Sequence, residues 1–363
     1  MTRTATAATR IERLEAEPLD LLLLEPFTIA TGRMAAARNV LVRLTLADGT
    51  VGLGEAAPFP PSGGETQETA LAAVRGMEPL LRGQDATHWR PLAHTLAASF
   101  EHQATARAAV EAAMLDALAR RWGVPLYQFF GGAESRVTTD ISIPIEEPEH
   151  VTELAERYSE RGAETLKIKV GTLVGEDIER VLAAQEGAPG CDLILDGNQG
   201  YAPYQAIELI ETLAGDGIRP ILFEQPVHRH DLEGLRFVAE RCGIPVAADE
   251  AVHTTADALR VARMGAANAI NIKLMKSGIV EALDIAAICR AAHLQLMVGA
   301  MLESRLGIAV SAHMVAGLGG FRYVDLDTPM LMERDPFTGG YVQEAMTYRL
   351  DGVKAGHGVT LAE

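Results

Sequence analysis

Five short apolar segments of this sequence are each followed by a charged residue, and these charged residues recur at nearly constant spacing. They are Lys169, Asp196, Glu224, Asp249 and Lys273, at successive steps of 27, 28, 25 and 24 residues. A (β/α)₈ barrel of ~250 residues has a repeat of roughly 30 residues. We therefore predict that each segment is a barrel strand followed by a helix. Because the C-terminal ends of barrel strands meet at one mouth, the five side chains are expected around a single cavity.

The same repeat continues on both sides of these segments. We expect the first strand within 137–143, because Ser142 lies 25 residues before Lys167, and the last two strands at 296–299 and 323–327. Helical periodicity occupies the intervals between strands, over 150–161, 175–185, 204–214, 231–241, 255–264 and 279–292. Eight strands with helices between them are therefore expected.

The N-terminal third of the chain does not follow this repeat. An Asp-Gly pair between two apolar segments predicts a β-hairpin over 40–54, and helical periodicity follows over 65–81 and 101–122. Two segments rich in glycine, proline or threonine are expected as loops that cover the barrel mouth, 26–39 and 56–66.

These patterns predict an α/β fold, a (β/α)₈-type, modified TIM barrel with an N-terminal α+β capping domain. The expected boundaries are 1–125 for the capping domain, 126–335 for the catalytic barrel, and 336–363 for a C-terminal segment that packs back on the capping domain. A chain of 363 residues is long enough for two such domains.

Charge and cysteine content restrict the partners and the compartment. The net charge of −17 argues against binding to nucleic acid or to anionic membrane surfaces. The three cysteines form no Cys-x-x-Cys pair, which is typical of reduced intracellular thiols, and the apolar segment 21–24 is far too short to span a bilayer. We expect a cytoplasmic enzyme.

The three acidic residues of the repeat predict a metal site. Asp196, Glu224 and Asp249 cannot all stay ionised at one mouth without a countercharge. A divalent cation supplies that charge, and a set of oxygen ligands without histidine or cysteine favours Mg²⁺ over zinc.

The lysines predict proton transfer at carbon. Lys169 and Lys273 lie on opposite sides of the acidic set in strand order, and Lys167 shares a strand face with Lys169. A lysine buried near a dication loses part of its preference for the charged form and can act as a base, and Lys167 would shift Lys169 further the same way. Two such bases could remove a proton from one face of a carbon acid and return it to the other, through a metal-stabilised enediolate. This is the chemistry of a racemase or epimerase.

Five motifs at these positions together resemble the enolase superfamily, muconate-lactonising subgroup. The motifs are Lys167-Ile168-Lys169, Asp196-Gly197-Asn198, Glu224-Gln225-Pro226, Ala248-Asp249-Glu250 and Asn271-Ile272-Lys273-Leu274-Met275-Lys276-Ser277-Gly278. The resemblance implies that Mg²⁺ binds the three acidic residues of the repeat and that Lys169 and Lys273 form the acid/base pair. It also implies supporting positions beside the ligands for Asn198, Glu250 and Asn271.

Within that subgroup, Asp325-Leu326-Asp327 resembles the Asp-x-Asp signature of dipeptide epimerases. The resemblance implies that Asp325 and Asp327 bind the free ammonium group of a dipeptide, with its carboxylate on Mg²⁺. It also implies substrate contacts for Ser142 and for Met301. Members that act on Ala-Glu carry an arginine in the first capping-domain loop. Here that position is Gly32, with Arg33 adjacent, so hydrophobic and cationic dipeptides stay open as substrates.

We therefore expect an isomerase that epimerises the C-terminal residue of a dipeptide, and relatives suggest a homo-oligomer. Three other reactions on the same scaffold are alternatives: a cycloisomerase, an N-acylamino-acid racemase and an o-succinylbenzoate synthase. Their substrates carry no free ammonium group and would not need Asp325 and Asp327. A non-catalytic metal-binding barrel is the alternative of another class, and the buried lysines disfavour it because they are costly without a function.

Overall fold

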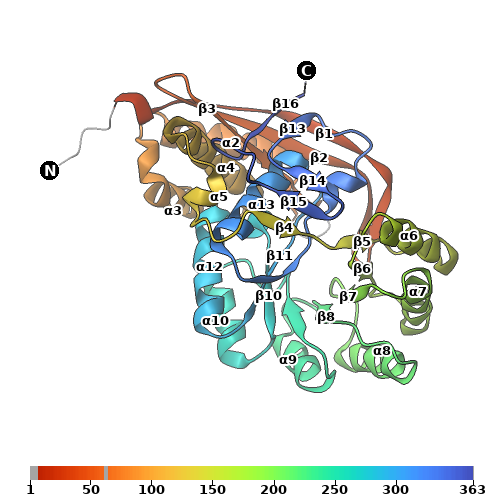
Figure 1. Ribbon diagram of the computed structural model, residues 1–363. Coiled ribbons are helices and arrows are strands. Elements are labelled where there is room, and N and C mark those ends of the chain that lie inside the picture. Colours follow the sequence, from red (N-terminus) through yellow and green to blue (C-terminus); the bar gives the residue numbers. More distant parts are fainter. Residues whose placement is uncertain (1–6, 61–63, 363) are drawn as a thin grey trace.

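The protein consists of a barrel with a second layered unit across its mouth. The computed structural model describes residues 7–60 and 64–362. In Figure 1, helices surround the barrel strands, and a long antiparallel sheet with helices of its own lies above them. The predicted α/β fold, a modified (β/α)₈ barrel with an α+β capping domain, is confirmed. The boundaries near residues 125 and 335 stay predictions.

The barrel is an eight-stranded parallel sheet whose strands neighbour one another in chain order. Its strands are β5 (Ile141–Ile143), β6 (Thr165–Lys169), β7 (Asp192–Asp196), β8 (Leu222–Glu224), β9 (Val246–Ala248), β10 (Ala269–Ile272), β11 (Gln295–Val298) and β12 (Phe321–Val324). The backbone N–H of Asp140 donates to the carbonyl of Val324 at 2.8 Å, which brings the first strand beside the last.

The six helices predicted for the barrel are all present, with ends within two residues of those expected. They are α6 (Pro148–Glu160), α7 (Val174–Gly187), α8 (Pro203–Gly215), α9 (Leu232–Arg241), α10 (Thr255–Met264) and α12 (Ile279–Ala291). Two others, α11 (Leu274–Ser277) and α13 (Arg305–Leu318), were not predicted from the sequence. Helix α13 is buried over nearly its whole length, so it lacks the polar face that makes a helix periodic in sequence.

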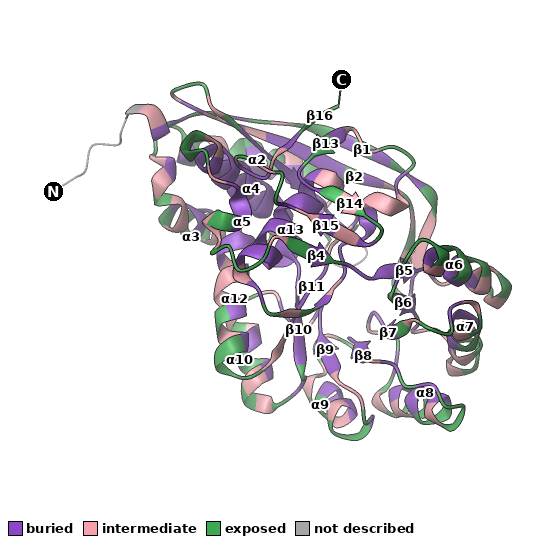
Figure 2. Ribbon diagram, viewed as in Figure 1, coloured by how far each residue is buried: buried purple, intermediate pink, exposed green. Residues whose placement is uncertain are grey.

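The capping domain is built on a three-stranded antiparallel sheet packed against helices. The sheet comprises β1 (Ile11–Ile29), β2 (Gly32–Leu46) and β3 (Val51–Ala56), and the helices are α2 (Gln67–Leu81), α3 (Trp89–Ser99) and α4 (Ala104–Trp122). Strand β3 lies directly on α4, because Gly54 has no side chain: a Cβ there would lie 2.0 Å from the carbonyl oxygen of Ala109. Figure 2 shows α4 buried between this sheet and the barrel, while the outer faces of α6 to α8 are exposed.

The prediction of a loop over 26–39 was wrong. Most of segment 26–39, expected as a loop, forms the paired ends of β1 and β2, in which Phe27 lies opposite Met34. The backbone of this segment is hydrogen-bonded within a long hairpin, whereas its glycine and threonine content is more typical of a loop. In the second predicted loop, residues 64–66 have no regular structure, and 61–63 lie outside the described residues.

The predicted first strand is divided between two sheets. Only β5 joins the barrel, whereas β4 (Arg136–Thr138) pairs antiparallel with β15 (Thr347–Arg349), which pairs with β14 (Val342–Glu344). The first half of this stretch therefore pairs with the C-terminal segment and the second half with the barrel. No pattern within 137–143 predicts this division.

The C-terminal segment contacts helix α4 of the capping domain. Arg120 donates to the carbonyl of Val359 at 2.7 Å, and the backbone N–H of His357 donates to Asp116 at 2.9 Å. Two more strands complete it, β13 (Phe337–Gly339) and β16 (Val359–Leu361), which pair antiparallel.

Four short elements connect the larger ones: α5 (Leu126–Phe129) and 3₁₀ turns at Ala7–Thr9, Ala86–His88 and Thr328–Leu331. Over the ranges that the structure describes, no helix has both the length and the apolar character needed to cross a bilayer.

Candidate active site

The charged residues of the repeat form one layer across the barrel, directly above an apolar layer. Six buried residues make up the apolar layer: Ile194, Leu222, Ala247, Ala269, Met297 and Tyr323. Asp196, Glu224 and Asp249 each follow a member of that layer by two positions. Because strand side chains alternate between faces, residues two apart point to the same side, and the acidic residues face the barrel interior.

Strand register brings the layer together laterally. Lys169 is the register partner of Asp196 on β7, and Asp196 is the partner of Glu224 on β8. The acidic residues therefore lie on neighbouring strands. Lys169 ends β6 and Lys273 follows β10, the second and sixth of the eight strands, so the two lysines lie across the barrel from each other.

Lys167 is the most enclosed charge of the site. Its side chain is fully buried, and its Nζ lies 3.0 Å from Asp196, 2.7 Å from Glu224 and 2.6 Å from Asp325. This ammonium group joins the three-carboxylate side of the barrel to the last strand. This geometry supports a role in holding the three carboxylates in fixed positions, in addition to the effect on the pKa of Lys169 that the sequence predicts.

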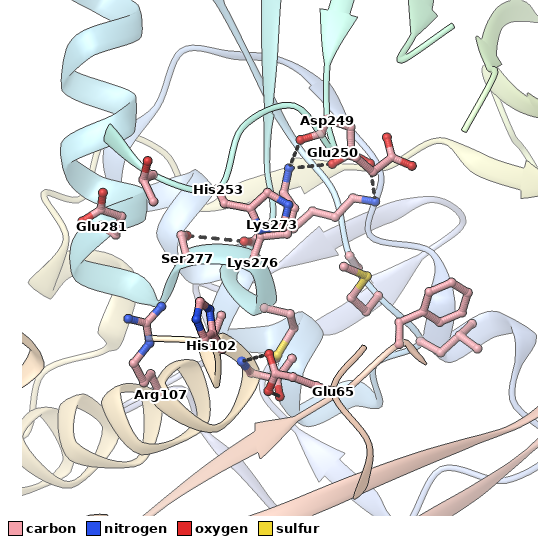
Figure 3. Close-up of a pocket in the computed structure, with 18 of the residues that line it drawn as sticks. Glu65, His102, Arg107, Asp249, Glu250, His253, Lys273, Lys276, Ser277 and Glu281 are labelled. Atoms are coloured by element: carbon pink, nitrogen blue, oxygen red, sulfur yellow. Dashed lines mark hydrogen bonds and ion pairs between the residues drawn. The ribbon is translucent and has the colours of Figure 1, made fainter. Parts of the chain in front are cut away.

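The other lysines each contact one carboxylate. Lys169 Nζ lies 2.6 Å from Asp196, and Lys273 Nζ lies 2.8 Å from Asp249. Lys276, which the sequence analysis did not select, donates to Asp249 Oδ1 at 2.6 Å and to the carbonyl of Asn271 at 3.0 Å. Figure 3 shows Lys273 and Lys276 both directed at Asp249, with Glu250 beside it.

Amide side chains support the carboxylates. Asn271 donates to Glu224 Oε1 at 2.7 Å, and Asn198 donates to Glu250 Oε1 at 3.3 Å and, through its backbone, to Asp196 at 3.1 Å. The three residues expected beside the ligands are thus in contact with the acidic set or with one another.

The site carries more buried carboxyl groups than ammonium groups. Seven buried acidic residues, Asp140, Asp196, Glu224, Asp249, Glu250, Asp325 and Asp327, share the barrel with four buried lysines, Lys167, Lys169, Lys273 and Lys276. Burial and the neighbouring Asp196 raise the pKa of Glu224 to about 7, and burial and Asp249 raise the pKa of Glu250 to about 8. Excess negative charge in a low-dielectric interior makes these groups hold protons or attract a cation.

The donor chemistry fits a hard divalent cation. Three buried oxygens beside the carboxylates, on Asn198, Glu250 and Asn271, have no hydrogen-bond partner among the described residues. All candidate donors are oxygen atoms, which suits Mg²⁺. Within the same described ranges, no three acidic, histidine or cysteine side chains already surround a metal position. Lysine nitrogens contact Asp196 and Asp249 instead.

Lys273 is held in the charged form by neighbouring carboxylates. Burial lowers the pKa of Lys273, but Asp249 and Glu224 outweigh it, and the net pKa lies above its ordinary value. The low pKa expected for Lys273 from the sequence would therefore require a cation that takes up the carboxylate charge.

A second acidic group lies at the end of β12. Asp327 accepts the backbone N–H of Ser142 at 2.6 Å, and burial together with Asp325 raises its pKa to about 6. Burial also raises the pKa of Asp325, but Lys167 outweighs this and keeps the net pKa low. Asp140, which the sequence analysis did not select, is buried nearby with no hydrogen-bond partner for its carboxyl oxygens among the described residues.

These groups open into one cavity of about 560 Å³ between the barrel and the capping domain. Nine of the residues selected from the sequence line it: Ser142, Lys169, Asn198, Asp249, Glu250, Lys273, Met301, Asp325 and Asp327. Four others, Lys167, Asp196, Glu224 and Asn271, are fully buried behind this wall. The roles assigned to all thirteen stay predictions.

The capping domain contributes an apolar wall. Phe27, Ile29 and Phe59 line the cavity, and the ring of Phe27 lies 5.8 Å from Lys169 Nζ. Arg33 is exposed and is not among the lining residues. Among the described residues, Arg33 is therefore not part of the cavity wall.

Comparison with known proteins gives full-length matches. Residues 17–131 match the family model "Mandelate racemase / muconate lactonizing enzyme, N-terminal domain", and residues 150–363 match "Enolase C-terminal domain-like". An aromatic dipeptide epimerase from Herpetosiphon aurantiacus is 45% identical over 98% of this chain and 99% of its own length. An L-Ala-D/L-Glu epimerase from Bacillus subtilis is 34% identical over 96% of each chain. A solved dipeptide epimerase from Enterococcus faecalis V583, complexed with Mg and L-Leu-L-Tyr, superposes with a TM-score of 0.93 at 35% identity, over 97% of this chain and 99% of that one.

Proposed function

This chain belongs to the mandelate racemase/muconate lactonizing enzyme family of the enolase superfamily, and from that membership we propose that it is a Mg²⁺-dependent dipeptide epimerase. The observation that carries the proposal is the presence of two acidic groups at one cavity. Asp249 lines the cavity beside the buried Asp196 and Glu224, and Asp325 and Asp327 line it from the segment after β12. A dipeptide zwitterion would use both groups, with its carboxylate on a metal held by the first and its ammonium group on the second.

Lys169 and Lys273 are suited to proton transfer at a carbon held between them. Lys169 ends β6 and Lys273 follows β10, across the barrel from each other, and both line the cavity. An α-carbon held between them presents one face to each Nζ. One lysine would remove the α-proton and the other would deliver a proton to the opposite face, which inverts the centre.

The metal would bind Asp196, Glu224 and Asp249, close to the unpartnered oxygens described above. When bound, Mg²⁺ would supply positive charge to the substrate carboxylate as the α-proton leaves. Lys167 and Lys276 would hold the carboxylates in fixed positions, because each contacts them through a buried ammonium group.

We further propose that the C-terminal residue of the substrate is apolar or aromatic. Phe27, Ile29 and Phe59 form the capping wall beside Lys169, and the neighbouring Arg33 is exposed. The relative from Herpetosiphon aurantiacus, described as an aromatic dipeptide epimerase, is more similar in sequence than the L-Ala-D/L-Glu epimerase from Bacillus subtilis. A cytoplasmic location and a homo-oligomeric assembly stay predictions from the sequence.

The test is α-proton exchange in D₂O with Mg²⁺ across a library of L,L-dipeptides, followed by mass spectrometry and chiral analysis. We expect deuterium at the C-terminal α-carbon, appearance of the D-epimer, and the fastest turnover with aromatic or aliphatic C-terminal residues. Exchange with acylated amino acids and with no free dipeptide would instead support the racemase alternative. Mg²⁺ binding without exchange of any ligand would support the non-catalytic barrel.

A further inference from the structure

Helix α12, which follows the Lys273 segment, receives its N-terminal cap from the capping domain. Its N-cap residue is Gly278, which offers no side chain, and the first N–H groups of a helix need acceptors. Glu111 of α4 supplies one: its Oε2 accepts from Ile279 at 2.7 Å and from Val280 at 2.9 Å. An N-terminal carboxylate also interacts favourably with the helix dipole.

Gly278 makes this approach possible. Its φ is +84°, a region that residues with side chains rarely adopt, and a Cβ at this position would lie 2.7 Å from Glu111 Oε1. The carboxylate of Glu111 therefore lies directly against the backbone between α11 and α12. Any other residue at position 278 would displace it.

One helical turn connects this contact to Lys273. Lys273 is the N-cap of α11, its carbonyl accepts from the N–H of Lys276 at 3.0 Å, and the N–H of Gly278 donates to the carbonyl of Leu274 at 2.8 Å. A turn closed by such hydrogen bonds is short and stiff. A shift of the α12 N-terminus would therefore move the backbone of Lys273.

The segment after Lys169 is held differently, from within the barrel. Asp177 of α7 accepts from the backbone N–H groups of Gly171 and Thr172 at 3.1 and 2.9 Å. Helices α9 and α10 likewise take their caps locally, from Asp231 and Thr254. The segment after Lys273 is thus held by a residue of the capping domain, Glu111, whereas the segment after Lys169 is held by a residue of the barrel.

Glu111 is enclosed and held in one place by its contacts. It is 4% exposed, and burial raises its pKa to about 7, although the N–H of Val280 and the charge of Arg107 oppose this rise. The acidic residues Glu65 and Glu281 also line this part of the cavity. Glu65 is itself occupied, because it accepts from the backbone and hydroxyl of Thr105. Figure 3 shows this region, with Arg107 and Glu65 on the capping side and Glu281 on the barrel side.

We propose that Glu111 is a positioning residue for Lys273, through which the capping domain sets the placement of one of the two lysines and leaves the other unaffected. The inference rests on the proposed function, because it assigns one lysine to each face of the α-carbon. Its consequence is an asymmetry: loss of Glu111 slows proton removal from one epimer and not from the other.

The first measurement compares the α-proton exchange of the two epimers of one dipeptide in D₂O. Lys273→Ala identifies the epimer whose proton Lys273 removes. Glu111→Ala should slow exchange of that epimer by on the order of 10- to 100-fold, because a displacement of about 1 Å costs that much, and leave the other within about threefold. Glu111→Gln, which keeps an acceptor oxygen, should restore most of the loss. Asp231→Ala, which removes the cap of α9, is the control for general destabilisation and should not change the ratio of the two rates.

The second measurement does not depend on any reaction. Amide hydrogen exchange should show faster exchange at Ile279 and Val280 in Glu111→Ala and unchanged exchange there in Asp231→Ala. If wild-type protein exchanges no dipeptide, the proposed function fails and these amides still decide whether the cap exists. Equal slowing of both epimers, or unchanged amide exchange, overturns the inference.

Discussion

Replacement of Asp327 by asparagine tests whether this residue binds the substrate ammonium group, because the substitution removes the charge and keeps the hydrogen bond. Asp327 is 1% exposed, and its Oδ2 accepts the N–H of Ser142 at 2.6 Å. Asparagine keeps a carbonyl oxygen for that hydrogen bond and loses the charge. A hydrogen bond to a charged partner contributes roughly 1.5–3 kcal/mol, so Asp327→Asn should lower kcat/KM by roughly 10- to 150-fold for a dipeptide with a free amine.

The pH dependence gives the same substitution a second readout. The pKa of Asp327 is raised to about 6, so below that pH the carboxyl is protonated and loses its attraction for ammonium. In the wild type, kcat/KM should fall as the pH drops through about 6, and Asp327→Asn should lack this part of the acid limb.

The control for Asp327→Asn is Asp335→Asn. Asp335 also accepts a backbone N–H at 2.6 Å, from Arg305, but does not line the cavity. The assay is epimerisation followed by chiral chromatography from pH 5 to 9. Activity of Asp327→Asn within about twofold of wild type, with an unchanged acid limb, would refute an ammonium-binding role for Asp327.

Two further predictions concern buried charge. Burial and Glu55 raise the pKa of Glu303 to about 8 from an ordinary value of 4.5. Between these two pH values the folded state keeps a proton that the unfolded state loses. The stability contributed by this carboxyl group is therefore fully present below pH 4.5 and is lost as the pH rises through 8. Glu303→Gln should therefore gain stability over wild type above pH 8, by up to roughly 5 kcal/mol. Urea unfolding at pH 6 and pH 9 measures this gain, and a difference that does not change with pH would contradict it. Removal of divalent cations with a chelator should abolish epimerisation and lower Tm, because the excess carboxylates lose their countercharge, and Mg²⁺ should restore both. An unchanged Tm in calorimetry, with or without Mg²⁺, would argue against the metal site.

Much of the charged layer was predictable because it depends on two regular periods. The strand period of two places a polar residue on the same face as the apolar residue two positions earlier, as in Ile194 and Asp196. The βα repeat then brings such residues from successive strands to one mouth. Both periods are local or nearly local properties of the chain, so the sequence alone reveals them.

Lys276 and Asp140 were missed for a different reason. Lys276 lies outside any strand, on the single turn of α11, and only the fold of that turn directs it at Asp249. Asp140 precedes a three-residue strand that is too short to show alternation. Their signals were present, in the motif after Lys273 and in the acid two residues before Ser142, but neither belongs to a repeated pattern.

The sequence by itself determined the barrel, the order of its strands and the identity of the residues at their ends, because these follow from hydrophobic periodicity and spacing. Only the tertiary structure decided which of those residues contact one another, that segment 26–39 pairs as strands, and that Glu111 lies against the N-terminus of α12. The contact of Glu111 joins residues 168 positions apart and depends on how the two domains pack, which no local pattern records.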